Sequence, residues 1–210
     1  MSTTEIPEPA QPRRRLSRED RQRQLLDMAW QLIREEGTDA LTLGYLAEKA
    51  GVTKPVVYDH FTTRAGLLAA LYQDFDRRQT ALMDAALANA KATLSGIASV
   101  IATAYVDCVL TQGNEIPGVI AALASTPELE RIKREYEAIF LEKCRSVLSP
   151  FADGAEIGQA GLRAMLGAAE ALSQAAATDE ISAEQARDEL FATILAMVER
   201  AATRTTKAGD

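Results

Sequence analysis

Histidine and cysteine are almost absent from this chain of 210 residues, which has one histidine and two cysteines. His60 stands alone, and Cys108 and Cys144 lie far apart in apolar, helical contexts. Metal sites need clustered ligands, so we expect no metal and no disulfide framework. No glycine-rich phosphate loop follows a strand pattern. We therefore predict no catalytic residues and no cofactor, with both thiols buried in a reducing cytoplasm.

Aromatic residues are also scarce, at 5%, and no segment alternates with the period of a half-buried strand. Hydrophobic residues still make up 47% of the chain, with much alanine and leucine, which favours packed helices over a sheet. The longest apolar run, from Ile97 to Val106, is too short to span a bilayer. The N-terminus lacks the apolar core of a signal peptide. We expect an all-α cytoplasmic protein with no membrane partner.

The chain has no excess of basic residues, since its formal net charge is −7. The charge is unevenly distributed: residues 1–64 carry ten Lys or Arg and ten Asp or Glu, whereas residues 65–210 carry thirteen and twenty. Six arginines between positions 13 and 23 face only Glu19 and Asp20, a local charge of +4. The first 16 residues are polar and rich in proline, and we expect a disordered basic arm there.

Four short polar residues stand where helices are expected to begin: Ser17, Thr42, Thr53 and Thr63. Gly37 and Gly51 are expected to end the first two of these helices. The fourth is expected to run to about residue 90. Further helices are expected near 91–112, 117–125, 127–148, 156–177 and 182–204, about nine in all.

The segment 42–61 holds two short helices separated by a tight glycine turn. Such a pair cannot form a core alone, but flanking helices can hold its second member outward. This geometry suits the major groove of DNA, which admits one helix. Thr53, at the start of that helix, can offer its hydroxyl and free N–H groups to a phosphate.

Residues 18–75 resemble the DNA-binding domain of the TetR family of bacterial one-component regulators. The resemblance is long and ungapped and covers about a quarter of the chain. It rests on Ala29, Leu32, Ile33, Gly37, Leu41, Thr42, Leu46, Ala47, Ala50, Gly51, Val52, Thr53, Val57, Tyr58, His60, Phe61, Thr63, Arg64, Leu67 and Leu68.

The resemblance implies DNA-contacting roles for positions in and around the motif. The expected DNA-binding residues are Thr42, Tyr45, Thr53, Lys54, Pro55, Val56, Tyr58, His60, Thr63 and Arg64. Lys54 is the candidate for reading a base edge, because lysine can donate to guanine O6 and N7. Gly44 departs from the family, which often has a polar residue there, and Tyr45 partly replaces that contact.

Plainer explanations exist for several of these positions. Tyr58 could be a core aromatic, and His60 could be a solvated residue at a helix end. Capping alone would explain Thr42 and Thr53. Trp30 is expected to be core packing.

Residues 158–172 are apolar or small on nearly every helical face, which requires burial on more than one side. The last two long helices could therefore pair with a second copy about a two-fold axis; the alternative is a monomer core. A homodimer predicts a palindromic operator with half-sites roughly 34 Å apart or more.

The middle helices are expected to enclose a pocket for a small-molecule effector, although plain packing would explain each residue taken singly. Its expected lining is Tyr105, Cys108, Val119, Leu123, Tyr136, Phe140, Cys144 and Met165. Two tyrosines could supply the polar anchors of such a pocket.

These observations predict three regions: a basic arm (1–16), a three-helix DNA-binding domain (17–75) and a helical bundle for effector binding and dimerisation (76–210). The expected function is a transcriptional regulator, a repressor by default, that a small molecule releases from double-stranded DNA. A helical protein-interaction adaptor is the main alternative. A helical enzyme is the other, although no constellation of residues favours it.

Overall fold

The computed structural model describes residues 16–112, 118–119, 121–122 and 127–208, and this part of the chain contains helices and connecting turns but no strand. The all-α prediction is confirmed. The described helices are α1 (Arg18–Glu36), α2 (Leu43–Lys49), α3 (Lys54–Phe61), α4 (Arg64–Ala88), α5 (Leu94–Gln112), α7 (Pro127–Leu148), α8 (Gln159–Ala177) and α9 (Ala183–Ala208), with short 3-10 turns at Thr38–Ala40 and Ser149–Phe151. The helix expected near 117–125, like the predicted arm, lies largely outside the described residues.

Three of the four expected helix caps, Ser17, Thr42 and Thr63, form as local hydrogen bonds. The Ser17 hydroxyl accepts from the N–H of Asp20 at 3.0 Å, and the Thr63 hydroxyl accepts from the N–H of Gly66 at 3.0 Å. Gly37 ends α1 at a φ of 83°, in the left-handed region that glycine adopts without strain. These bonds satisfy N–H groups that have no partner within the helix. The boundaries of the first helices therefore follow from nearby residues alone.

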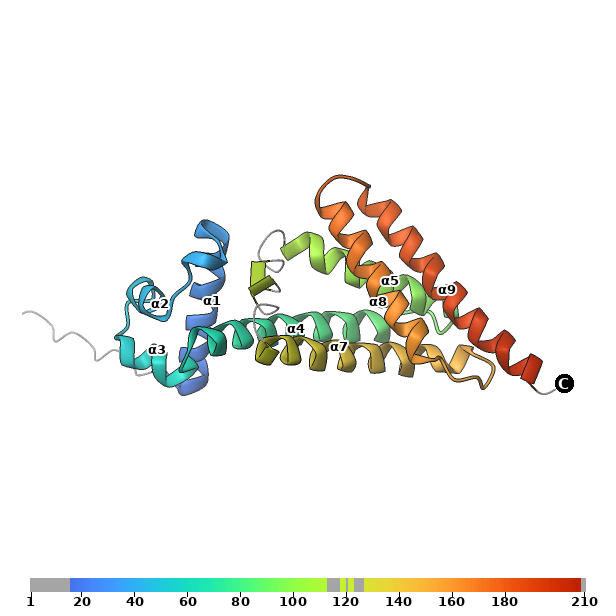
Figure 1. Ribbon diagram of the computed structural model, residues 1–210, viewed down its shortest axis with the longest axis horizontal. Helices are drawn as coiled ribbons and strands as arrows, with labels where there is room; N and C mark the ends of the chain where they lie inside the picture. The colour runs from blue at the N-terminus through green and yellow to red at the C-terminus, as the bar shows by residue number, and fades with distance from the viewer. Residues whose placement is uncertain (1–15, 113–117, 120, 123–126, 209–210) are drawn as a thin grey trace, which may run out of the picture.

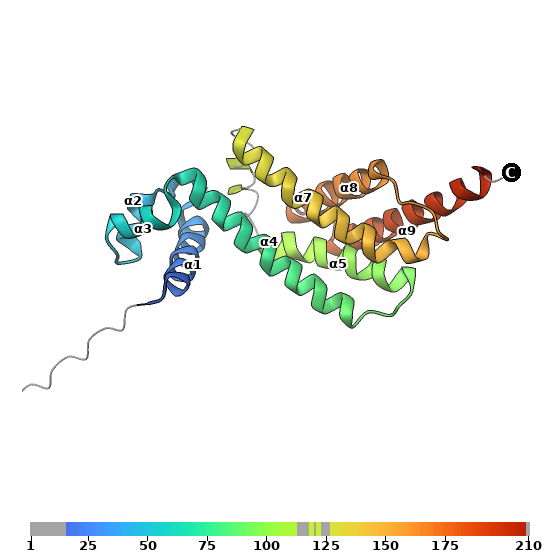
Figure 2. The same ribbon diagram turned by 90° about the horizontal axis from the view of Figure 1, so that it is seen from below.

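Figures 1 and 2 show two lobes, a small one built by α1, α2 and α3 and a larger helical body, with α4 running from one into the other. Each lobe has its own hydrophobic cluster: Tyr72 belongs to the first and Met83, further along α4, to the second. Residue 75, where the sequence predicts a division, lies between these two residues on one continuous helix, and the first cluster also includes Val119.

Trp30 is buried in the first cluster, as expected, and its indole N–H lies 3.4 Å from Oδ2 of the buried Asp74 on α4. Asp74 also pairs with Arg77 at 2.8 Å and with Arg78 at 2.6 Å. Arg78 in turn lies 3.3 Å from Asp27 of α1. This network joins α1 to α4 beneath the smaller lobe.

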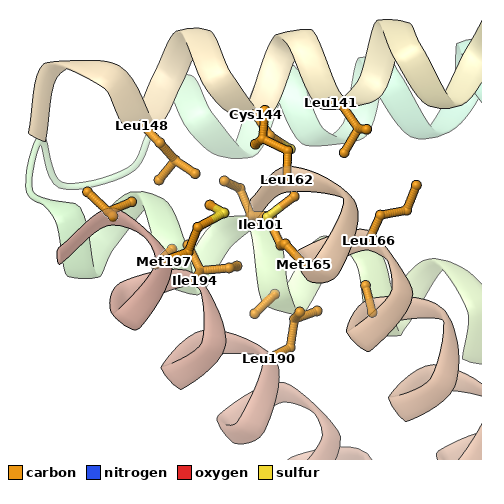
Figure 3. Close-up of a cluster of buried hydrophobic side chains, with 14 of the residues drawn as sticks. Ile101, Leu141, Cys144, Leu148, Leu162, Met165, Leu166, Leu190, Ile194 and Met197 are labelled. Carbon is orange, nitrogen blue, oxygen red and sulfur yellow. The ribbon is translucent and has the colours of Figure 1, made fainter. Parts of the chain in front are cut away.

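The body is built on α5, which packs against α4, α7, α8 and α9. Its segment Leu94–Thr111 is long and apolar enough to cross a membrane, so the sequence-based expectation of no such stretch was too narrow. The segment nevertheless packs against four other helices of the bundle, and its buried residues, Ala98, Ile101, Ala102 and Val106, make up 22% of it. Figure 3 shows part of the surrounding cluster.

Candidate nucleic-acid interface

The two short helices of the motif are fixed by a tight turn. Gly51 adopts a φ of 63°, and the N–H of Val52 donates to the carbonyl oxygen of Ala47 at 3.0 Å. The Thr42 hydroxyl caps α2 by accepting from the N–H of Tyr45 at 3.1 Å. Leu46 and Ala47 of α2 are buried in the smaller lobe, so α2 supports α3 from behind.

The α3 helix has one buried and one exposed face. Val57 and Phe61 point into the core and are 0% and 4% exposed. Thr53, Lys54 and Pro55 are exposed around its start. Helical spacing places the next outward position at Tyr58, which is 50% exposed and is therefore not a core aromatic. An outward helix with a basic residue and a tyrosine can enter the major groove and reach a flanking phosphate.

Thr53 precedes α3 in an extended conformation, as a cap residue should, but its hydroxyl makes no hydrogen bond to the helix. The prediction of Thr53 as the residue before α3 is confirmed, but the expected hydrogen bond from a helix N–H to its hydroxyl does not form. Without a capping bond, the Thr53 hydroxyl is available to an external partner, whereas Pro55 has no N–H and the N–H of Val56 already donates to the Thr53 carbonyl oxygen at 3.0 Å. Val56 itself is half-buried.

Gly44 and Lys54 are neighbours across the α2–α3 pair. A Cβ atom built on Gly44 would lie 3.7 Å from Cε of Lys54, which is ordinary van der Waals contact. The absence of a side chain at residue 44, where the family often has a polar one, therefore leaves room beside the exposed lysine.

Tyr45 and Arg64 are both half-buried and bond to groups of the smaller lobe. The Tyr45 hydroxyl donates to Oε1 of Glu36 at 2.7 Å. Arg64 donates from Nε to the carbonyl oxygen of Leu41 at 2.9 Å and from Nη2 to that of Thr38 at 2.8 Å. Both side chains thus have structural roles, and their contact with DNA stays a prediction.

His60 is half-buried near the end of α3. Burial, followed by the positive charge of Arg18, lowers the pKa of its imidazole. Arg18 reaches α3 from α1, with Nη1 3.3 Å from Oδ2 of Asp59 and Nη2 donating to the Asp59 carbonyl at 3.2 Å. This bond between α1 and α3 was not foreseen from the sequence. It is a non-local contact between exposed residues, and helical periodicity carries no signal for it.

A second candidate site is a cavity of about 140 Å³ in the body, lined by residues of α4, α5, α7 and α8. Four of the predicted lining residues are found there: Tyr105, Cys108, Tyr136 and Phe140. Burial raises the pKa of the Cys108 thiol to about 12. The contribution of α4, chiefly Tyr72, Phe75 and Asp76, was not foreseen from the sequence. The signal was available, since Tyr72, Asp76 and Gln79 recur at helical spacing.

The other predicted lining residues are placed elsewhere. Cys144 and Met165 belong to the cluster of buried side chains that Figure 3 draws. They are 0% and 1% exposed and do not line the cavity. Val119 is buried in the cluster of the smaller lobe. Leu123 lies outside the described residues. An apolar helical face indicates burial, but it does not distinguish a tight contact from a hollow.

The arrangement defines a class of protein: an all-α molecule that presents a helix-turn-helix motif on a separate helical body. Residues 25–71 match the family of bacterial regulatory proteins described as the tetR family. These residues therefore form a DNA-binding domain of the tetR type, and the match points to a DNA-binding regulator rather than an enzyme.

Three known proteins show the extent of the similarity. The HTH-type transcriptional activator FasR of Mycolicibacterium smegmatis is 39% identical over 59 residues, which are 28% of this chain and 27% of FasR. The chain thus matches about a quarter of that relative's length. A putative TetR-family transcriptional regulator from Rhodococcus sp. superposes with a TM-score of 0.72 at 20% identity, covering 86% of this chain and all of the other. The fatty acid degradation regulator FadR from Bacillus halodurans superposes with a TM-score of 0.66 at 14% identity, covering 85% of this chain and 95% of the other.

Proposed function

We propose that the chain is a cytoplasmic, dimeric transcriptional repressor that binds a palindromic operator and is released from it by a small molecule. The observation that supports this most directly is the division of α3, with Val57 and Phe61 buried and Lys54 and Tyr58 outward. Thr42, Thr53, Thr63 and His60 surround this face and supply phosphate contacts. Lys54, Pro55 and Val56 meet the base edges.

The dimer is proposed to form through α8 and α9. The outward side of α8 carries small residues at helical spacing, and Ala160, Ala164, Gly167 and Ala171 are all exposed in the single chain. Small side chains permit close approach of a second helix, and a two-fold axis would pair the same face of both copies. Two outward α3 helices would then meet successive major grooves, which accounts for a palindrome.

Effector release is proposed to depend on α4, because this helix contributes to both the DNA-binding lobe and the cavity. A ligand that favours another α4 position would favour another spacing of the two α3 helices, and this would lower operator affinity. By thermodynamic linkage, bound operator would lower the affinity for the ligand by the same factor. FasR is named an activator, so the sign of regulation is open to a direct test. Repression remains our proposal because it is the usual mode of the family.

The decisive experiment selects genomic fragments with the purified full-length protein and measures their binding by fluorescence anisotropy at several salt concentrations. We expect a recovered palindrome, a mass of two chains in light scattering, and affinity that falls steeply with salt because phosphate contacts release counterions. A reporter gene behind the recovered site gives the sign of regulation. A protein-interaction adaptor would instead show no palindrome and no sequence preference.

A further inference from the structure

The cavity in the body has an unbalanced set of charged groups. Three carboxylates line it, from Asp76, Glu137 and Glu170, and the one cationic side chain among the lining residues is Lys133. The formal sum is −2. An apolar cavity with surplus negative charge selects against anionic ligands, because an added carboxylate would be buried beside like charges.

The lysine is fully engaged by two of these carboxylates. Its Nζ lies 3.1 Å from Oε1 of Glu137 and 3.5 Å from Oε1 of Glu170. Burial opposes the charge of Lys133, but its bonds to the two glutamates outweigh burial and raise its pKa. Glu137 also accepts from Nη1 of Arg163 at 2.7 Å. Three of the four charged lining groups thus already have partners.

Asp76 is the exception. It is half-buried on α4 and forms no hydrogen bond or ion pair with any residue that the structure describes. Burial raises the pKa of its carboxyl, and the nearby Lys143 lowers it only in part. Lys143 forms its ion pair with another residue, since its Nζ lies 2.6 Å from Oδ1 of Asp84. A carboxylate kept half-buried without a partner is costly unless something else supplies the positive charge.

Aromatic rings line the same cavity as this carboxylate. Five line the cavity: Tyr72, Phe75, Tyr105, Tyr136 and Phe140. They pack in pairs, with centroids 5.5 Å apart for Tyr72 and Tyr136 and 5.6 Å apart for Tyr105 and Phe140. The face of an aromatic ring carries partial negative charge and attracts ammonium groups, most strongly where water is excluded.

We propose that this cavity binds a small organic cation, with its charged nitrogen at Asp76 and its apolar body among the aromatic rings. The inference rests on the proposed effector function and specifies the chemistry of that effector. The cavity volume of about 140 Å³ is close to that of a buried cavity that admits benzene, so one ring or a branched chain fits. The geometry selects against fatty carboxylates, although one of the similar proteins is named a fatty acid degradation regulator.

The test uses three probes of similar shape on the full-length protein: benzyltrimethylammonium, its uncharged isostere 2,2-dimethylpropylbenzene, and the anion 3-phenylpropanoate. Binding is measured by isothermal titration calorimetry, with decanoate as a fatty-acid comparison. We expect the cation to bind at least about tenfold more tightly than the neutral isostere, and the two anions to bind more weakly still.

Asp76→Asn should remove most of the cation's advantage while leaving affinity for the neutral probe unchanged. Glu135→Gln is the matched control: it removes one negative charge from α7 beside Tyr136, at a residue that pairs on the surface with Arg131 and does not line the cavity. This variant should keep the preference for the cation. Circular dichroism and thermal unfolding of both variants show whether they fold alike.

The outcomes separate this inference from the proposed function. Equal binding of cation and neutral probe, tighter binding of either anion, no binding of any probe, or a preference that survives Asp76→Asn would each overturn the inference. If decanoate binds and releases the selected operator, the effector function stands and the cation assignment fails. If the cation binds as expected but operator affinity does not change, the cation site stands and the proposed release mechanism fails.

Discussion

Gly118 lies against Thr38 so closely that a Cβ atom at residue 118 would stand 2.5 Å from the Thr38 Oγ1 atom. The carbonyl oxygen of Thr38 is also one of the two that Arg64 binds at the start of α4. Val119, next to Gly118, is fully buried in the hydrophobic cluster of the smaller lobe. The body thus reaches the DNA-binding lobe at the residue that anchors α4.

Gly118→Ala should disturb this contact, because the new methyl group needs space that Thr38 occupies. We expect a loss of about 1–3 kcal/mol in the free energy of unfolding, as for other overpacked contacts, together with altered operator affinity. Urea unfolding and fluorescence anisotropy measure the two effects. Gly158→Ala is the control, since a Cβ there meets nothing within 4 Å. If both variants behave alike, the contact has no energetic importance.

Lys54→Ala should weaken operator binding by about 1–3 kcal/mol and relax the preference at one base pair in each half-site. The reason is the position of the side chain on the exposed start of α3, where it can reach a guanine edge. Competition with a set of single-base operator variants measures both effects.

Lys91→Ala serves as the control for Lys54, because Lys91 is exposed between α4 and α5 and belongs to the body. Its removal should leave specificity unchanged. An unchanged base preference in Lys54→Ala would show that the lysine is not a reading residue. A uniform loss across all operator variants would make it a phosphate contact.

Operator affinity should rise as the pH falls below the ordinary range of histidine. Burial and Arg18 lower the pKa of His60 in the free protein, and a nearby phosphate would raise it, so protonation and DNA binding favour each other. Affinity should increase by up to about tenfold for each unit by which DNA raises that pKa. Anisotropy titrations between pH 5.5 and 7.5, chosen to span about one unit on each side of a typical histidine pKa, measure the effect.

His60→Gln is the matched variant for this experiment, because glutamine keeps a hydrogen-bond donor that does not titrate in that range. It should bind the operator with an affinity that changes little over the same pH interval. His60 is the only histidine in the sequence, so no other imidazole can account for a difference between the two proteins. Identical pH profiles would contradict the phosphate contact.

Asp74→Ala should destabilise the junction of α1 and α4. The substitution leaves the buried indole N–H of Trp30 without an acceptor and takes a partner from Arg77 and Arg78. We expect a loss of about 1–3 kcal/mol in the free energy of unfolding. Urea titration followed by the fluorescence of Trp30 measures it. Asp84→Ala, an exposed position on the same helix, should cost clearly less, and an equal cost would contradict the role of the network.

The smaller lobe could be predicted closely because the signals that define it are local. Ser17, Thr42 and Thr63 each bond to an N–H three residues further along, so the helix starts can be read from short stretches of sequence. The outward face of α3 follows from helical spacing. The internal bonds of Arg64 could not be predicted, because they join residues 23 and 26 positions apart that meet only after folding.

The cavity was predicted less well, and Cys144 and Phe140 illustrate why. Both belong to α7 and both occupy apolar positions, but Phe140 borders the hollow whereas Cys144 is packed in the core. The difference depends on how far neighbouring helices stand from α7, which one helix's periodicity does not encode. The importance of Asp76 was missed for a related reason: its lack of a partner becomes apparent only when the surrounding side chains are in place.

In the proposed release mechanism, the length of α4 determines how far ligand binding would displace the DNA-binding helices. Its 25 residues span about 37 Å. Arg64, which bonds to the smaller lobe, is at one end, and the cavity residues from Tyr72 onward lie along its middle. A tilt of about 5° around one end of such a rod displaces the other end by about 3 Å. Because Arg64 binds the carbonyl oxygens of Thr38 and Leu41, the helix-turn-helix would travel with the rod instead of absorbing its motion. A ligand no larger than a single ring could therefore misalign an entire half-site.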